Sequence, residues 1–300
     1  MTSRKAKRLT LVIFKITGLL LLVLVFGSYF LYRSGYPSQV LSLQSTASIP
    51  ISKNAFSFPL VSAKYIFILD RTSKTVLYQK EATKKIYPAS TTKMVSAIVA
   101  LEHFPLTQII QISKTYSEGQ ILGLLPGQRL SVQQLLYGLL VQSANDSAEV
   151  LAENYPGGRT AFVSVMNDKV KEWGVTDTHF VNPSGLDENN HYSTALDLVK
   201  IADLAMKYAD FAKIVATETA VLDSGANNHL LVLKNVNELL GKVPGVMGVK
   251  TGFTTGAGQS LISLVGRNGH EVLFAVLGST DRFDDTRKLI DWVFTNFEWP

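Results

Sequence analysis

Strand-like and helix-like segments follow one another in this 300-residue chain in an order that limits the possible folds. Residues 63–82 contain two apolar runs joined by a polar turn, and the first run, residues 65–69, is apolar enough for a central strand. The middle of the chain has apolar residues at helical spacing, and its last part returns to strand-like runs. This order predicts an α+β or α/β sandwich in which the terminal strands share a sheet and the helices form a second lobe. We expect a functional site in the cleft between them.

The individual elements can be placed approximately from their periodicity. Helices are expected in residues 87–104, around residues 135–140, after Ser147, and over residues 161–174, 193–216 and 284–297. Strands are expected at residues 248–253, 259–267 and 270–279, and Asn268-Gly269 predicts a hairpin turn between the last two.

The N-terminal 60 residues differ from the rest of the chain. Residues 1–8 form a basic tail, and residues 9–32 are apolar except for Thr10, Lys15 and Thr17, which is long enough to cross a bilayer. Because basic flanks stay inside and no convincing cleavage site follows, we expect a retained single-pass anchor in the cell membrane. Residues 33–60 are expected to be an extracellular linker, and residues 61–300 a folded domain outside the membrane.

Charge and composition exclude several classes of function. Six of the 29 basic residues precede residue 34, which leaves 23 basic against 24 acidic residues, so no basic surface for nucleic acid is expected. The chain has no cysteine, which excludes disulfides and thiolate catalysis, and a 46% hydrophobic composition must supply the core. The histidines lack metal-ligand spacing and no phosphate-binding glycine motif occurs, so we expect no metal and no cofactor.

The stretch "YPASTTKM" opens the first expected helix with Ser90 and places Lys93 among apolar neighbours three residues later. Residues three apart lie on one helical face, so the two side chains are expected to meet. A serine hydroxyl becomes a good nucleophile when an adjacent base removes its proton. A buried lysine near a second cation and a helix N-terminus has a lowered pKa and can be that base.

Two further short motifs follow in order. "QSANDS" places Ser143 and Asn145 in a polar break between two expected helices, and "VKTGF" places Lys250, Thr251 and Gly252 on a strand. Each motif alone is usually a cap or a turn. The order S-x-x-K, S-x-N, K-T-G, spaced by 53 and then 107 residues, is specific.

With these motifs the chain resembles the penicillin-recognising serine enzymes. Within them it is similar to the serine-type D-alanyl-D-alanine carboxypeptidases, which are low-molecular-weight penicillin-binding proteins. The resemblance covers roughly residues 60–298 and includes "HFVNPSGLDENNHYSTALDLVKIA" and "DRFDDTRKLIDWVF". It implies a β-lactamase/transpeptidase-like fold, with an antiparallel sheet flanked by helices and an active-site cleft beside a helical lobe.

The resemblance also implies the activity and the roles of residues. Ser90 would attack the penultimate D-alanine carbonyl of a peptidoglycan stem peptide, with Lys93 as base, Ser143 as proton relay and Asn145 bonded to Lys93 and to the substrate amide. The backbone amides of Ser90 and Phe253 would form the oxyanion hole. The residues expected to hold the terminal carboxylate are Lys250, Thr251 and, by motif position, Arg282, and Gly252 and Phe253 are the other expected substrate-binding residues. β-Lactams would acylate Ser90 as covalent inhibitors, and a monomer is expected.

Two rival functions remain open at this level. A serine β-lactamase shares the motifs, but the deacylating glutamate of class A enzymes lies well after the S-x-N loop, whereas "EVLAEN" at residues 149–154 follows it at once. A non-catalytic cell-wall sensor is disfavoured by the intact motifs. Transpeptidation in the same site, the third stem-peptide residue and the preferred β-lactam are not determined by the sequence.

Overall fold

The computed structural model describes residues 48–53, 57–223 and 230–300. The expected basic tail, membrane anchor and residues 33–47 of the expected linker lie outside the described residues. Within the described ranges, no helix has the length and apolar character needed to cross a bilayer.

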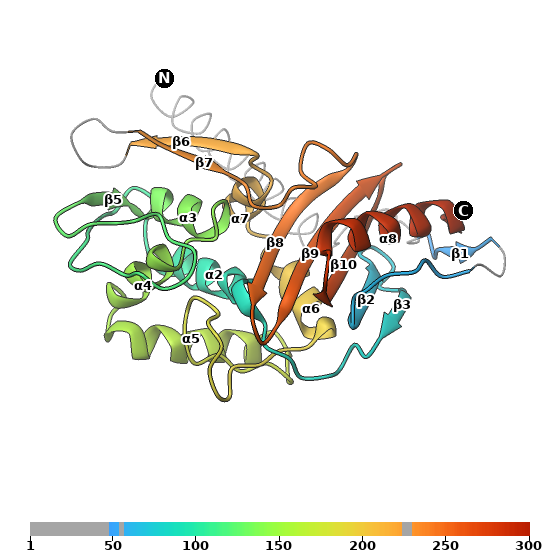
Figure 1. Cartoon of the computed structure of the whole chain (residues 1–300), viewed down its shortest axis with the longest axis horizontal. Helices are drawn as coiled ribbons and strands as arrows, with labels where there is room; N and C mark the ends of the chain where they lie inside the picture. The colour runs from blue at the N-terminus through green and yellow to red at the C-terminus, as the bar shows by residue number, and fades with distance from the viewer. Residues whose placement is uncertain (1–47, 54–56, 224–229) are drawn as a thin grey trace, which may run out of the picture. The chain divides into compact units, whose positions relative to one another are not determined.

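A five-stranded antiparallel sheet forms one half of the domain (Figure 1). Its strands, in spatial order, are β3 (Val76–Lys80), β2 (Tyr65–Asp70), β10 (His270–Ser279), β9 (Gly258–Arg267) and β8 (Val246–Thr254). The expectation that N- and C-terminal strands share one sheet is therefore confirmed. The turn between β9 and β10 has φ +53° at Asn268 and +82° at Gly269, as the Asn-Gly pair predicts.

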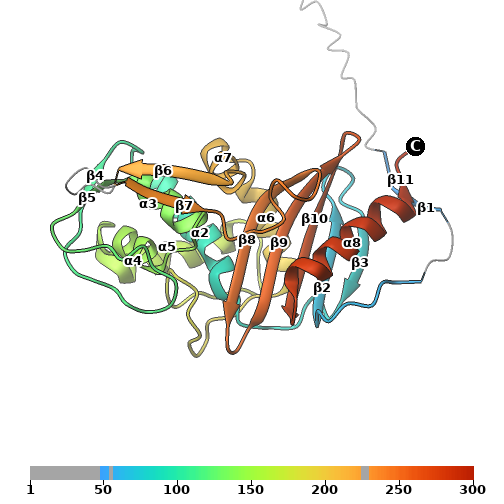
Figure 2. The same ribbon diagram turned by 45° about the horizontal axis from the view of Figure 1, so that its top comes forward.

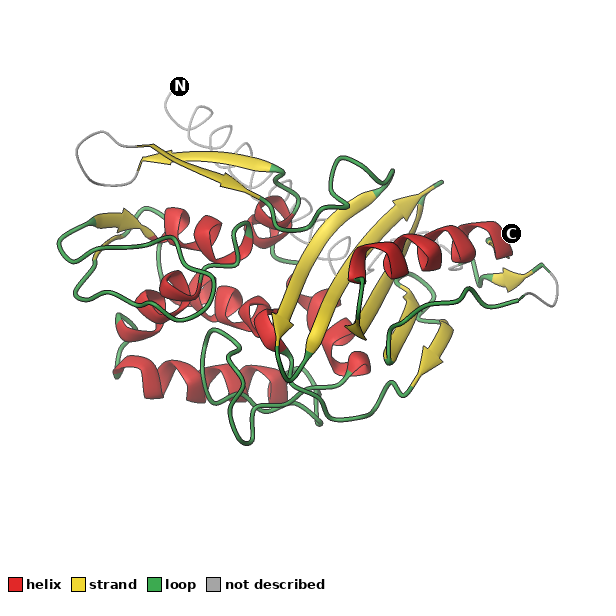
Figure 3. Ribbon diagram, in the orientation of Figure 1, coloured by secondary structure: helices red, strands yellow, loops and turns green. Residues whose placement is uncertain are grey.

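The helices lie on both faces of the sheet and in a separate lobe (Figure 3). They are the 3-10 helix η1 (Ala89–Thr92), α2 (Lys93–His103), α3 (Val132–Leu140), α4 (Asn145–Glu153), α5 (Gly158–Glu172), α6 (Ala195–Ala205), α7 (Ala209–Val215) and α8 (Arg282–Asn296). Three small two-stranded sheets complete the domain: β1 (Ile51–Ser52) with β11 (Phe297–Glu298), β4 (Ile109–Gln111) with β5 (Arg129–Ser131), and β6 (Thr219–Asp223) with β7 (Leu230–Lys234).

The sheet separates two hydrophobic clusters, because alternate side chains of a strand point to opposite faces. On β2, Ile66 and Ile68 belong to the cluster under α8, whereas Phe67 belongs to the cluster under the helical lobe. Figure 2 shows α8 on one side of the sheet and α6 on the other. Helix α2 is buried from residue 93 to residue 100, which makes it the core helix of the lobe. The layers therefore place the start of α2 beside the edge strand β8.

Three expectations about element bounds need correction. The helix expected over residues 193–216 is two helices, because Tyr208 between them is extended. Its hydroxyl donates to Glu102 at 2.6 Å. Helix α4 begins at Asn145, two residues before Ser147, where the Asp146 carboxylate accepts the backbone N–H of Ser147. Strand β1 lies in the expected linker and pairs with β11, so this part of the linker belongs to the domain.

Candidate active site

The turn that carries Ser90 is a short 3-10 helix that continues directly into α2. Pro88 precedes it with φ −76°, and its carbonyl accepts the Thr91 hydroxyl at 2.6 Å. Ala89 has φ +49°, in the left-handed region that residues other than glycine rarely adopt. The chain therefore holds a strained conformation immediately before Ser90, which is half-buried.

Lys93 is fully buried and makes three hydrogen bonds through its Nζ. It donates to Ser90 Oγ at 2.8 Å, to Asn145 Oδ1 at 2.6 Å and to the Ser184 carbonyl at 2.6 Å. Burial lowers the pKa of Lys93 to about 7, although the negative charges of Glu149 and Asp146 act in the opposite direction. The lysine can therefore lose its proton near neutral pH while it contacts the serine hydroxyl.

Ser143 lies in the break between α3 and α4, as the sequence predicts, whereas Asn145 is already the first residue of α4. Ser143 has φ +61°, and its Oγ accepts a hydrogen bond from Lys250 Nζ at 2.8 Å. Besides accepting from Lys93, Asn145 donates its side-chain N–H to the Glu118 carbonyl at 2.8 Å. This bond fixes the side-chain amide, so Asn145 joins the lysine to the loop that precedes β5.

A buried carboxylate next to Asn145 holds that loop in place. The side chain of Asp146 is fully buried and accepts backbone N–H groups of Leu122, Gly123 and Leu124 at 2.9–3.1 Å. The backbone N–H of Asn145 also donates to the Gln120 carbonyl at 2.6 Å. Residues 118–124, which we call the wall loop, are thus fastened to the first turn of α4. The sequence interpretation missed this role, although Asp146 lies directly beside the S-x-N motif.

Strand β8 forms the opposite wall of the site and is an edge strand of the sheet in the part of the chain that the structure describes. Lys250 is 1% exposed and donates to Ser143 Oγ and to the Thr251 carbonyl. Burial, Lys93 and Arg282 all lower the pKa of Lys250. A Cβ at Gly252 would lie 3.1 Å from the Ala89 side chain and 3.3 Å from the Ser90 nitrogen, so glycine permits the close approach of β8.

Arg282 belongs to this second wall and is not an ordinary surface arginine. It is the first residue of α8, and its Nη1 donates to the Gly252 carbonyl at 3.0 Å. Its Nε is buried and has no hydrogen-bond partner among the described residues. Burial lowers the pKa of Arg282, an effect that Glu238 and Asp281 oppose. A cation with an unpaired donor is therefore available beside β8.

The residues predicted from the motifs lie close together at the start of α2, at the start of α4 and on β8. Ser90 contacts Lys93, Lys93 contacts Asn145, and Lys250 contacts Ser143 from β8. Thr251 is 4% exposed, whereas Phe253, near the end of β8, is 63% exposed. The carbonyl of Ser184 is a partner of Lys93 that sequence reasoning missed, because a backbone acceptor has no residue signature.

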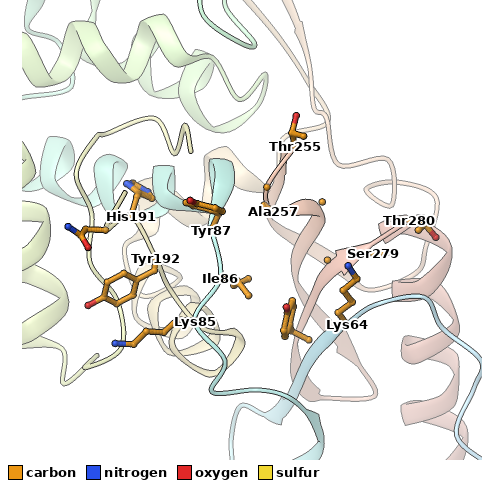
Figure 4. Close-up of a pocket in the computed structure, with 15 residues that line it drawn as sticks. Lys64, Lys85, Ile86, Tyr87, His191, Tyr192, Thr255, Ala257, Ser279 and Thr280 are labelled. Carbon is orange, nitrogen blue, oxygen red and sulfur yellow. The ribbon is translucent and has the colours of Figure 1, made fainter. Parts of the chain in front are cut away.

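Two of the cavities in the described ranges border this arrangement on the sides of Asn145 and Tyr87. One of about 350 Å³ reaches Asn145, Ser184 and Glu118 and extends to the ion pair between Glu149 and Arg159. The other, of about 570 Å³, lies below the β8–β9 turn between Tyr87, His191 and Ala257 (Figure 4). In the described ranges no cluster of three or more histidine, aspartate or glutamate side chains is arranged to hold a metal ion.

Lys93, whose pKa is lowered, contacts Ser90, and Lys250 contacts Ser143 opposite them. This arrangement can activate a serine for nucleophilic attack, as serine hydrolases require. The family model of the D-alanyl-D-alanine carboxypeptidases (peptidase family S11) matches residues 52–281, and the chain belongs to this family. Its members are serine peptidases of the penicillin-binding class, so the sequence-based identification of family, fold and enzyme class is confirmed.

Individual relatives support this assignment. The D-alanyl-D-alanine carboxypeptidase DacB2 of Mycobacterium tuberculosis is 35% identical over 262 residues, which cover 84% of this chain and 87% of that protein. DacF of Bacillus subtilis is 30% identical over 246 residues, 79% of this chain but only 63% of DacF. The crystal structure of the Streptomyces K15 DD-transpeptidase has a TM-score of 0.76 at 32% identity and covers 80% of this chain and 100% of that one.

Proposed function

We propose that this protein removes the terminal D-alanine from peptidoglycan stem pentapeptides through an acyl-enzyme on Ser90, and that β-lactams acylate the same serine. The observation that carries the proposal is the contact of 2.8 Å between Ser90 Oγ and the buried Nζ of Lys93. Because the pKa of Lys93 is about 7, a substantial fraction of this lysine is neutral at pH 7 and can accept the serine proton.

Acylation uses groups on both walls. Neutral Lys93 takes the proton of Ser90 as Oγ attacks the carbonyl carbon of the penultimate D-alanine. The backbone N–H groups of Ser90 and Phe253 stabilise the oxyanion, a role supported by the close approach of Gly252 to the Ser90 nitrogen. Ser143, bonded to Lys250, relays the proton that Lys93 took to the leaving amine, so that Lys93 is neutral again and Ser143 keeps its hydroxyl. The C–N bond breaks, D-alanine leaves, and water hydrolyses the ester to release the shortened peptide and free Ser90.

The second wall recognises the terminal carboxylate of the substrate. Lys250, Thr251 and the unpaired Nε of Arg282 provide cationic and hydroxyl donors beside the scissile bond. A bound carboxylate would raise the pKa of Lys250, because opposite charge favours the protonated form. Two buried lysines repel when both are charged, so protonation of Lys250 favours neutral Lys93. Substrate binding thereby promotes the form of Lys93 that acts as a base.

The rival functions are less well supported. Glu149 and Glu153 lie on α4, and each is already held in an ion pair, with Arg159 and Lys114 respectively. Neither therefore matches the water-activating glutamate of a class A β-lactamase. Transfer of the acyl group to an amine is the other candidate, since the similar Streptomyces K15 structure is a DD-transpeptidase.

The direct test measures D-alanine release from a muramyl-pentapeptide by the full-length chain and by Ser90→Ala. We expect release that disappears in Ser90→Ala, together with covalent labelling of the unmodified enzyme by a fluorescent penicillin. An added amine acceptor distinguishes hydrolysis from transfer by the product that forms. Rapid and complete turnover of the penicillin without D-alanine release would instead identify a β-lactamase, and neither labelling nor release would identify a sensor.

We also propose that residues 9–32 anchor the protein in the cell membrane with the catalytic domain outside, as a monomer. The length of the apolar run and the basic residues before it support this topology. Intact cells treated with a protease should lose the catalytic domain while cytoplasmic proteins survive. Replacing residues 9–32 with a cleavable signal should release the domain from the membrane, and light scattering of the detergent-extracted chain should give the mass of one copy.

A further inference from the structure

His191 is a buried histidine close to the nucleophile that the proposed reaction does not use. Its side chain is 1% exposed and lies among residues 181–193, the segment that carries Ser184. Its Nε2 lies 2.9 Å from Thr92 Oγ1, and its Nδ1 accepts the backbone N–H of Val181 at 3.1 Å. The imidazole therefore joins this segment to the turn between Ser90 and Lys93.

These two contacts determine the tautomer of the ring. Nδ1 faces an N–H donor, so it carries no proton, and the proton of a neutral imidazole must then be on Nε2. Nε2–H consequently donates to the hydroxyl oxygen of Thr92. Burial lowers the pKa of His191 to about 4, with a further lowering from His179 and an opposing effect of Asp187. The ring is neutral at the pH at which the enzyme works, and its hydrogen bonds have a fixed direction.

The turn that His191 contacts is strained and needs support from its neighbours. Ala89 has φ +49°, and such conformations persist where the surroundings hold them. Gly252 packs against this turn from β8. On the other side, a Cβ at Gly185 would lie 1.9 Å from the Ala89 carbonyl oxygen, so the segment of residues 182–185 packs directly against the turn at Gly185. The same residues supply the Ser184 carbonyl that accepts Lys93.

We propose that His191 is a positioning residue that fastens the segment 181–193 to Thr92, and thereby keeps Ser90 and Lys93 in reactive geometry. The inference rests on the proposed function for the roles of Ser90 and Lys93. Without the two hydrogen bonds of His191, the turn that carries Ser90 can relax, and the distance between Ser90 and Lys93 changes. The carboxylate-binding residues on β8 and at Arg282 stay in place. The effect therefore falls on the acylation step and on kcat, with little change in KM.

The test compares His191→Leu, His191→Gln and the control His103→Leu in the full-length chain, purified in detergent. His103 is exposed at the far end of α2, so its variant should match the unmodified enzyme. A misplacement of about 1 Å can cost about 10²-fold in rate, and we expect His191→Leu to acylate with penicillin about 10- to 100-fold more slowly. An amide can keep one of the two hydrogen bonds, so His191→Gln should recover most of the rate.

Nitrogen-15 NMR of the histidine rings provides an independent readout. We expect the ring of His191 to remain protonated at Nε2 only from pH 6 to 8. A doubly protonated ring in this range, or the opposite tautomer, would overturn the proposal. So would a folded His191→Leu variant with the acylation rate of the control.

A second variant and the choice of assay separate the role of His191 from misfolding and from the proposed function. If His191→Leu does not fold, Thr92→Val removes the partner hydroxyl alone, and the proposal then requires slower acylation with a melting temperature close to that of the control. Unchanged acylation in Thr92→Val would overturn it. Penicillin acylation does not depend on D-alanine release, so an enzyme that is acylated but releases no D-alanine contradicts the proposed function and leaves the role of His191 testable.

Discussion

The two walls of the active site are built in different ways. On the sheet wall, β8 is placed by its antiparallel register with β9, in which residues 249–254 face residues 258–263. On the helix wall, the positions of Ser90, Lys93 and Asn145 depend on loops that a few buried polar side chains hold. A backbone ladder distributes its hydrogen bonds over many residues, whereas a loop can depend on one carboxylate. Single substitutions should therefore perturb the helix wall more than the sheet wall.

The largest effect is expected for Lys93→Met, which keeps the length of the side chain and removes its amine. Loss of a general base typically costs about 10²–10⁴-fold, and acylation by penicillin should fall by about that factor. The exposed Lys171→Met on α5 serves as the control. Acylation within threefold of the control, measured by stopped-flow fluorescence, would show that Lys93 is not the base.

Lys93→Met should also change how stability depends on pH. In the folded protein the pKa of Lys93 is about 7, below the ordinary value of 10.5, so the unfolded chain binds more protons between these values. The free energy of unfolding of the unmodified enzyme, relative to that of the variant, should therefore rise from about pH 7 to about pH 10.5 and be level below pH 7. Urea titrations across this range measure it, and a flat difference would contradict the lowered pKa.

The second-largest effect is expected for Asp146→Ala, which tests whether the Asp146 side chain alone holds the wall loop. Asp146→Ala leaves the N–H groups of residues 122–124 without their acceptor, and that of Leu124 is buried, where an unpaired donor costs about 1–3 kcal/mol. We expect a lower melting temperature and an acylation rate reduced by about 10-fold or more, since Asn145 loses its support. Asp168→Ala, at an exposed position of α5, should change neither quantity. An unchanged rate would mean that Asn145 is positioned without the loop.

The third effect concerns the sheet wall. Arg282→Gln removes a cation expected to hold the substrate carboxylate, and a charge-assisted hydrogen bond contributes about 1.5–3 kcal/mol. We therefore expect KM for the pentapeptide to rise by about 10- to 100-fold, with a smaller change in kcat. Arg287→Gln, on the exposed side of the same helix, is the matched control. A fall in kcat at constant KM would place Arg282 in the chemical step.

The difference between the sheet wall and the helix wall also explains which parts of the site could be predicted from the sequence. The sheet, the core helix and the residues around the cleft follow from periodicity, from motif spacing and from a resemblance to a known family. The groups that hold the helix wall do not. The Ser184 carbonyl has no signature, and His191 resembles any other core histidine until the fold brings it to Thr92, 99 residues away. Likewise, Tyr208 at the break between α6 and α7 donates to Glu102, 106 residues away, a contact that local periodicity cannot reveal.

The smallest expected effect is electrostatic, because the lysines of the two walls have neighbours of different charge. Every charge that acts on Lys250 lowers its pKa, whereas Glu149 and Asp146 raise that of Lys93. Glu149→Gln removes one of these carboxylates without deleting a contact to Lys93, so the pKa of Lys93 should fall further. Because the base must be neutral, kcat/KM rises with pH through this pKa, and the acidic limb of the pH profile of kcat/KM should move to lower pH by less than about one unit.

The control is Glu153→Gln, one turn along α4, which should leave this acidic limb in place. A limb that does not move in Glu149→Gln would mean that solvent and Arg159 already screen this charge, and that burial alone sets the pKa of the base.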